Sequence, residues 1–265
     1  MSHGDRFAYS EFLPEWIAIL GKKHQGAKRL KIAVISDVHA NLPALRAALQ
    51  AIQQEGYDLL VHLGDAIAIG PLPAECLEVL LNVPKAQFIM GNHDDWLVQG
   101  LPQPQPDWMS DGEVAHQRWT HQQISAEQKA SVSLWPYLIQ HNFAGVSVSF
   151  LHYALAANGR DFASFLKQPT PADFAPIFPA TELVFYGHTH LVSDMQGQTR
   201  YINPGSIGCQ VEAIAPYLMA EFGHGRHTIE YRTVAYEDAP LAKAFADRQV
   251  PERAFLRQAF FGGRF

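Results

Sequence analysis

Asp, His and Asn residues occur together in five short runs of this chain, and these are residue types that hold divalent metal ions. Carboxylate, imidazole and amide oxygen together suit Mn²⁺, Fe²⁺, Zn²⁺ or Ni²⁺, whereas an all-oxygen set would favour Mg²⁺ or Ca²⁺. Each run alone is a weak signal, because short motifs arise by chance. All five in order predict a hydrolytic site with two metal ions. The runs are Asp37-Val38-His39, Gly64-Asp65, Gly91-Asn92-His93-Asp94, His152 and Gly187-His188-Thr189-His190.

The spacing within the runs indicates how two ions could be held. Side chains alternate in direction along an extended segment, so Asp37 and His39 can point the same way. A loop that carries His188 and His190 can instead direct its two imidazoles at different ions. A carboxylate between two ions about 3.5–4 Å apart is the natural bridge. Asp65 is our candidate for that bridge.

Each run follows an apolar segment that is typical of a β-strand. Apolar strands at 30–36, 58–63 and 86–90 alternate with helical patterns, the first of which begins after Asn41 and the second of which spans 74–82. This alternation predicts an α/β fold with a parallel, right-handed βαβαβ core. Ligands of such sheets bind beyond the carboxyl ends of the strands, where Asp37, Asp65 and Asn92 fall.

The rest of the chain divides into blocks of different character. Residues 95–140 begin with three closely spaced prolines (Pro102, Pro104 and Pro106), which two helical patterns follow, 113–124 and 126–134, and we expect a helical insertion over or beside the site. The following residues are strand-rich, and for the whole chain we expect two packed sheets with helices outside. The predicted organisation is an N-terminal extension with a short helix (1–29), a domain (30–236), and a C-terminal helix and tail (237–265). The expected strand segments of the second half are 137–143, 146–152, 182–186, 192–196, 199–203, 216–222 and 227–234.

Charge and composition limit the partners of this chain. Its 265 residues carry a formal net charge of −6, and the largest basic cluster, residues 22–31, precedes the first strand. A protein that grips long nucleic acid needs a basic stripe to displace counterions, and no such stripe is present. We therefore expect a small phosphorylated substrate, which bound metal ions would attract.

The two cysteines, Cys76 and Cys209, form no C-x-x-C pattern. This excludes a cysteine-type zinc site and a disulfide framework. No run approaches the roughly 18 apolar residues of a membrane span. Residues 1–5 do not resemble the start of a signal peptide. We expect a reduced, cytoplasmic protein without a membrane partner.

In order and type, the five runs resemble the calcineurin-like metallophosphoesterase superfamily, over roughly residues 30–235. The small bacterial and archaeal phosphoesterases of this superfamily also carry an N-P-G-S segment, here residues 203–206. The resemblance implies a four-layer α/β/β/α sandwich of two mixed sheets with a dinuclear metal site. By motif position, one ion is expected at Asp37, His39, Asp65 and His190, and the second at Asp65, Asn92, His152 and His188.

The resemblance also implies a mechanism. A hydroxide that bridges the ions would attack phosphorus in line, because metal coordination lowers the pKa of water to about 7. His93 would point away from the ions, contact the phosphate and protonate the leaving oxygen, with Asp94 orienting its ring. The expected activity is hydrolysis of phosphodiesters or small phosphorylated metabolites. A phosphomonoesterase is the alternative, and a non-catalytic protein-binding scaffold is a further one, against which the retention of His93 and every ligand argues.

Several positions differ from the superfamily pattern or allow a second interpretation. Many relatives carry Arg before G-N-H and a basic residue after N-P-G-S, where this chain has Met90 and Gln210-Val211-Glu212. These differences affect the expected identity of the substrate rather than the expected metal ligands. His141 and His116 compete with His152 as the lone histidine ligand. Four tryptophans near the insertion either pack or stack a nucleobase: Trp96, Trp108, Trp119 and Trp135.

Overall fold

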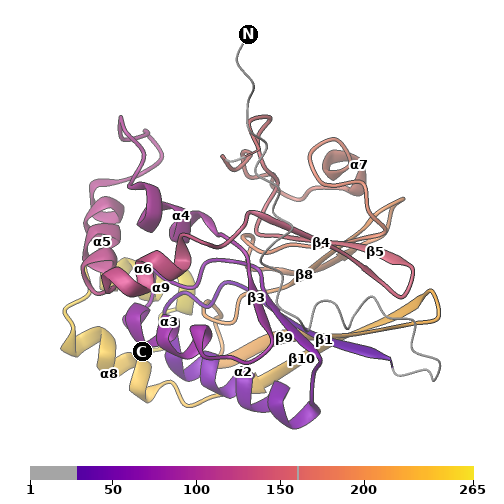
Figure 1. Cartoon of the computed structure of the whole chain (residues 1–265). Coiled ribbons are helices and arrows are strands. Elements are labelled where there is room, and N and C mark those ends of the chain that lie inside the picture. The colour runs from indigo at the N-terminus through magenta and orange to yellow at the C-terminus, as the bar shows by residue number, and fades with distance from the viewer. Residues whose placement is uncertain (1–28, 160) are drawn as a thin grey trace.

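Two five-stranded sheets pack face to face in the computed structural model, which describes residues 29–159 and 161–265 (Figure 1). The predicted helix of the N-terminal extension lies outside the described residues. The first sheet has the order β10 (Arg226–Ala235), β9 (Ile214–Gly223), β1 (Leu30–Ile35), β2 (Leu59–His62) and β3 (Ala86–Phe88). The second has the order β4 (Leu138–Phe143), β5 (Val146–Leu151), β6 (Leu183–Phe185), β8 (Arg200–Pro204) and β7 (Val192–Met195).

Both sheets are mixed, as predicted. In the first sheet β1, β2 and β3 run parallel, with Val34 opposite Val61. Strand β9 is antiparallel to both of its neighbours, β1 and β10. In the second sheet β5, β6 and β8 run parallel, and the edge strands β4 and β7 are antiparallel. Loops follow the carboxyl ends of the parallel strands in both sheets, and these loops contain the five polar runs.

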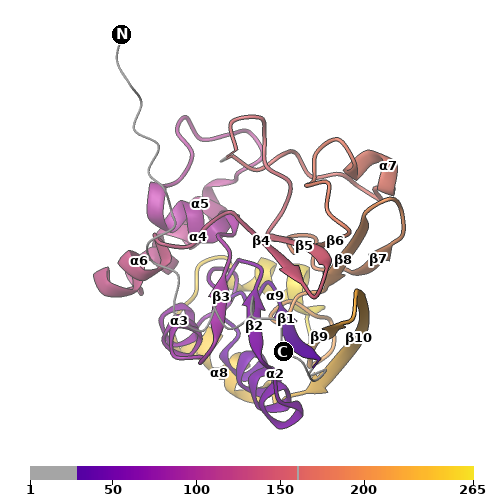
Figure 2. The same ribbon diagram turned by 45° about the vertical axis from the view of Figure 1, so that its right-hand side comes forward.

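Several helices cover the outer face of the first sheet, and one short helix lies on the outer face of the second, which gives the α/β/β/α layers. Strand β1 alternates: Ile32 and Val34 face the second sheet, whereas Ala33 and Ile35 pack against α2 (Leu42–Glu55) and α3 (Pro73–Leu81). On the other side, α7 (Pro171–Phe174) packs its Phe174 on the second sheet. The two views agree that α2 and α7 lie on opposite sides of the sheets (Figures 1 and 2).

Helix α2 begins after Asn41, as its sequence predicts, and ends before a glycine. The side chain of Asn41 accepts a hydrogen bond from the N–H of Ala44 at 3.2 Å, which caps the first turn, and Pro43 occupies that turn. Gly56 follows the last residue with a φ of 72°, a conformation that favours glycine. The helix buries Ala44, Leu45, Ala48 and Ile52 against the sheet.

The insertion contains one more helix than predicted. Besides α5 (Asp111–Gln122) and α6 (Ala126–Val132), a helix α4 (Asn92–Gln99) begins within the third polar run. A capping box begins α6, because Ser125 Oγ accepts from the N–H of Gln128 at 3.2 Å while Gln128 Oε1 accepts from the N–H of Ser125 at 3.1 Å. Helices α4, α5 and α6 lie together at one end of the sheets (Figure 2).

The C-terminal segment forms two helices, α8 (Ala239–Asp247) and α9 (Arg253–Phe261), where one helix and a tail were predicted. Leu241 and Phe245 of α8 and Phe261 of α9 form a buried cluster with Ile69 and Cys209. The tail therefore packs against loops that surround the candidate site. Within residues 29–159 and 161–265, no helix combines the length and apolar character needed to cross a membrane.

Candidate functional site

The five polar runs converge where the parallel strands end. The runs follow β1, β2, β3, β5 and β6, so both sheets contribute. The loops are joined by backbone hydrogen bonds, including Asp37 N–H to Gly64 O at 3.0 Å and Gly187 N–H to His152 O at 2.8 Å. Loops at the carboxyl ends of adjacent parallel strands are the usual ligand sites of such sheets.

Four side chains lie close together, each near His39, and we name them cluster 1: Asp37, His39, Asp65 and His190. Nε2 of His39 lies 2.8 Å from Nε2 of His190. It also lies 3.7 Å from Oδ1 of Asp37 and 3.8 Å from Oδ2 of Asp65. Nε2 of His190 lies 3.5 Å from Oδ1 of Asp37. Ligand atoms about 2.1 Å from one ion are separated by about 3–4 Å, so this set fits a single cation.

Four side chains also form cluster 2: Asp65, Asn92, His152 and His188. Nε2 of His152 lies 3.2 Å from Oδ2 of Asp65 and 3.1 Å from Oδ1 of Asn92. Nδ1 of His188 lies 3.0 Å from the same Asn92 oxygen and 3.2 Å from Nε2 of His152. These separations fit a second cation.

Asp65 contributes the same oxygen atom to both clusters. Its Oδ2 faces His39 in cluster 1 and His152 in cluster 2, while its Oδ1 accepts the backbone N–H of His93 at 2.9 Å. The carboxylate is thus held in one orientation with Oδ2 directed between the clusters. The grouping of residues is the one that the sequence predicted, and the ions themselves stay a prediction.

Two of the imidazoles are oriented as metal-binding histidines usually are. Nδ1 of His39 lies 3.1 Å from the carbonyl oxygen of Ile67, and Nδ1 of His152 lies 2.9 Å from that of Leu63. A ring that donates its Nδ1–H to a carbonyl presents the Nε2 lone pair. In both residues Nε2 is the atom that faces its cluster, so the donor set fits a cation.

Most candidate ligands have a backbone conformation that is rare outside glycine. Five of the seven have positive φ, with values from 45° to 67°: Asp37, His39, Asp65, His188 and His190. Such conformations cost about 1–3 kcal/mol each and persist where the surrounding structure imposes them, often at functional sites.

Glycines in the runs allow the loops to approach each other closely. A Cβ at Gly91 would lie 2.2 Å from the backbone nitrogen of Asp65, and one at Gly187 would lie 2.1 Å from Oγ of Ser36. Any side chain at either position would push the loops apart. The glycines of G-N-H-D and G-H-T-H are therefore part of the site geometry.

The electrostatics of the clusters favour positive charge between them. Burial favours neutral carboxyls, but the neighbouring imidazoles outweigh it and hold the pKa values of Asp37 and Asp65 well below their usual range. Burial likewise opposes charge on His152, yet the Asp65 carboxylate raises the pKa of that ring to about 9. Divalent cations would supply the same positive charge and displace the imidazole protons.

His93 lies over cluster 1 rather than pointing away from it. Its ring centroid is 5.3 Å from that of His39, and one of its nitrogens lies within 4.8 Å of ligand atoms of His39 and Asp65. Gln117 of α5 reaches Nδ1 of His93 at 2.6 Å. Desolvation lowers the pKa of His93 to about 3, so the doubly protonated ring requires a nearby negative charge such as a phosphate.

The prediction that Asp94 orients the His93 ring is wrong. The Asp94 carboxylate accepts backbone N–H groups of Asp65 at 2.7 Å, Ala66 at 3.1 Å and Gly91 at 3.1 Å. The reason is that Asp94 is the third residue of α4, so its side chain turns back to the helix N-terminus. Asp94 thus ties the loop after β3 to the loop after β2.

The competing histidines lie elsewhere. His141 lies 2.9 Å from the Gln87 side chain, and Nε2 of His116 accepts from the N–H of Ile69 at 2.8 Å. Among the tryptophans, Trp135 is buried against β3 and Trp119 packs near the C-terminal helices. The ring centroid of Trp96 lies 4.8 Å from that of His93 and 6.0 Å from that of Trp108, on which it stacks. Trp108 is 64% exposed.

Two residues of the site were missed by sequence reasoning. Gln117 and Cys209 belong to no motif, and each reaches the site from a distant segment. A buried polar residue on an amphipathic helix was the available signal for Gln117. For Cys209 the sequence offered no signal, because this residue belongs to no C-x-x-C pattern.

The chain is similar to known proteins over most of its length. A family model described as the calcineurin-like phosphoesterase superfamily domain matches residues 30–223. An uncharacterized protein of Methanocaldococcus jannaschii is 28% identical over 249 residues, which cover 88% of this chain and 98% of that protein.

Solved structures match over a similar length. The crystal structure of a metallophosphoesterase from Sphaerobacter thermophilus aligns with a TM-score of 0.65 and 25% identity, covering 88% of this chain and 99% of that one. A hypothetical protein from Pyrococcus horikoshii OT3 aligns with a TM-score of 0.71 and 20% identity, covering 89% and 100% of the two chains. The residues matched by the family model, 30–223, include the loops that carry both clusters.

Proposed function

The chain belongs to the calcineurin-like phosphoesterase superfamily, and on that premise we propose that it is a two-metal phosphoesterase acting on phosphodiesters or small phosphorylated metabolites. One observation carries the proposal: Oδ2 of Asp65 lies 3.8 Å from Nε2 of His39 in cluster 1 and 3.2 Å from Nε2 of His152 in cluster 2. A shared carboxylate is how a protein holds two ions close enough to act on one phosphoryl group.

Two divalent ions bound there would activate water for in-line attack and neutralise charge on the phosphoryl oxygens. The chain's own residues orient the ligands. Asp37 accepts hydrogen bonds from the Ser36 hydroxyl at 2.5 Å and from the backbone N–H of His188 at 3.1 and 3.2 Å. Such bonds reduce the reorganisation needed when substrate binds.

We assign His93 to the substrate phosphate and the leaving oxygen. The ring stands over cluster 1, and Gln117 fixes its orientation from the insertion. A bound phosphate brings negative charge to the ring and so raises its pKa above the value of about 3 that it has without substrate. The ring then holds a proton that it can pass to the leaving oxygen.

Two neutral side chains, at positions where many relatives carry a basic residue, suit a diester better than a monoester. Met90 stands directly before G-N-H-D and is buried, and the amide of Gln210 is bound to the carbonyl oxygen of Ser206 at 2.9 Å. Neither residue offers positive charge to a phosphate. A monoester dianion needs more compensation than a diester monoanion, so a diester suits these neighbours better.

A substrate panel tests the proposal. Bis-p-nitrophenyl phosphate and p-nitrophenyl phosphate are each assayed with Mn²⁺, Ni²⁺, Zn²⁺ and Mg²⁺. We expect hydrolysis that depends on a transition ion and a higher kcat/KM for the diester. A preference for the monoester would establish the phosphomonoesterase alternative. Folded, metal-loaded protein without activity on any phosphate ester would favour a binding scaffold.

A further inference from the structure

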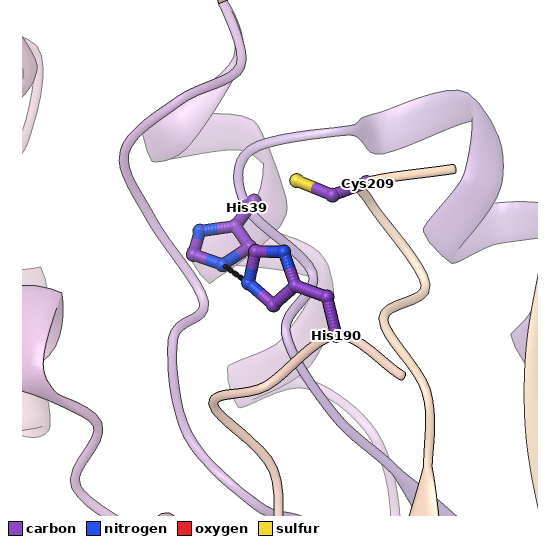
Figure 3. A group of neighbouring side chains, drawn as sticks. All are labelled: His39, His190 and Cys209. Carbon is purple, nitrogen blue, oxygen red and sulfur yellow. Dashed lines mark hydrogen bonds between the residues drawn. The ribbon is translucent and has the colours of Figure 1, made fainter. Parts of the chain in front are cut away.

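Cys209 brings a thiol to cluster 1. One ligand atom each from His39, His190 and Cys209 lie within 4.8 Å of one another. In Figure 3 the Cys209 sulfur points toward the two imidazoles from the segment that follows β8. We propose that Cys209 is a further metal ligand of cluster 1, whose thiolate joins His39 and His190 on a thiophilic ion such as Zn²⁺ or Co²⁺. This inference rests on the proposed metal site.

The segment that carries Cys209 is fixed against the loop that carries Asp37 and His39. The N–H of Gly208 donates to Asp37 O at 2.9 Å, and the N–H of Ile207 donates to Ser36 O at 3.0 Å. A Cβ at position 208 would lie 2.0 Å from the carbonyl oxygen of Val38, so only glycine allows this approach.

The Cys209 backbone itself is also held. Its N–H donates to Ser206 Oγ at 2.8 Å, and that hydroxyl donates to Asp37 O at 2.7 Å. The thiol is therefore presented to the imidazoles by a pre-formed turn, which lowers the entropic cost of adding it to a coordination shell.

The surroundings of the thiol are apolar on the side away from the clusters. Cys209 is 7% exposed and packs with Leu241, Phe245 and Phe261 of the C-terminal helices. A thiolate in such a place requires a cation beside it. On coordination the S–H bond breaks, the metal–sulfur bond forms and the proton leaves to solvent.

A thiolate in cluster 1 would give the two clusters different metal-ion preferences. Cluster 2 contains the hard amide oxygen of Asn92 beside its imidazoles and carboxylate. Soft thiolate ligands select Zn²⁺ and similar ions, whereas oxygen ligands suit Mn²⁺ and Mg²⁺. We therefore expect a thiophilic ion in cluster 1 and a broader choice of ions in cluster 2.

Cobalt spectroscopy of the full-length protein tests the inference. Wild-type protein loaded with Co²⁺ should show near-ultraviolet thiolate-to-Co²⁺ charge-transfer absorption together with visible d–d bands. Cys209→Ser should lose the charge-transfer absorption and keep the visible bands. In competition titrations it should weaken Zn²⁺ binding by about tenfold or more, with little change for Mn²⁺.

Cys76 provides the matched control. It is the other buried cysteine, and it lies on α3 in the core beneath the first sheet. Cys76→Ala should retain both kinds of absorption. Cys209→Ala offers the same comparison if the serine variant folds poorly, with circular dichroism as the check on folding.

The outcomes separate this inference from the proposed function. Visible bands without charge transfer in the wild type would overturn the Cys209 assignment and leave the two-metal site intact. Charge transfer that survives in Cys209→Ser would also overturn it. A wild-type protein with no cobalt bands would overturn both.

Discussion

The side-chain amide of Gln117 lies 2.6 Å from Nδ1 of His93, so a helix of the insertion holds the ring that stands over cluster 1. The two residues come from different helices, α5 and α4. The insertion therefore contacts the candidate catalytic residue His93 directly, in addition to following it in the chain.

Removal of this contact should slow catalysis without removing metal. In Gln117→Ala the His93 ring loses its partner, and we expect kcat to fall by about 10- to 100-fold, the size of effect that a misplaced reacting group produces. Metal content should stay at the wild-type level. Gln123→Ala is the control, since Gln123 ends the same helix and bonds to Trp119 O at 3.4 Å. Unchanged kcat in Gln117→Ala would show that the contact has no catalytic role.

Substitution of His93 should separate acid catalysis from metal binding. His93→Asn should keep both metals and lose about 10²–10⁴-fold in kcat on alkyl phosphate esters, whose poor leaving groups need a proton. The loss should be smaller on p-nitrophenyl esters. Equal losses on both substrates would point to phosphate positioning by His93, and loss of metal would make His93 a ligand.

Asp94 should matter for the integrity of the site rather than for proton transfer. In Asp94→Ala three buried backbone N–H groups lose their acceptor, and we expect a loss of unfolding free energy on the order of 2 kcal/mol or more. The metal content should fall with it, because the Asp65 loop is released. Thermal unfolding and metal analysis measure the two effects.

The neighbouring acid is a suitable control for that experiment. Asp95→Ala removes the acceptor of one hydrogen bond, from the Tyr137 hydroxyl at 2.6 Å, so its effect on stability should be smaller. Comparable losses in the two variants would contradict the special role of Asp94.

The exposed Trp108 should affect which substrates are preferred. Trp108 and Trp96 stack beside His93 and offer an aromatic surface to a substrate's substituent. Trp108→Ala should raise KM several-fold for diesters with planar aromatic substituents, since stacking contributes about 1–3 kcal/mol, and should leave dialkyl substrates unaffected. Leu134 is an exposed apolar residue of the same insertion, and Leu134→Ala should change the KM of neither substrate type. Equal KM changes on both substrate types would contradict a stacking role.

The strands and the ligand loops could be predicted because each loop follows a continuous apolar run. Leu30–Ile35 and Leu59–His62 pair nearly where the sequence predicts, and Asp37 and Asp65 follow directly. Local pattern is enough here, since a parallel buried strand needs apolar residues on both faces. The grouping of the seven candidate ligands follows from the order of the loops.

What the sequence could not predict depends on contacts between distant segments. The start of α4 at Asn92 turns the Asp94 side chain to the backbone, and no residue pattern distinguished this from an orientation toward His93. Gln117 meets His93 across 24 residues of chain. Cys209 reaches His190 because the turn after β8 is bonded to the loop after β1.

The central claim is that Oδ2 of Asp65 bridges two metal ions, and anomalous diffraction tests it most directly. Crystals soaked in Co²⁺ should give two anomalous peaks about 3.5–4 Å apart, one in each cluster, with the Asp65 carboxylate between them. Crystals of Asp65→Asn treated in the same way should lose occupancy at both positions. A single peak in the wild type, or full occupancy of both positions in Asp65→Asn, would contradict the claim.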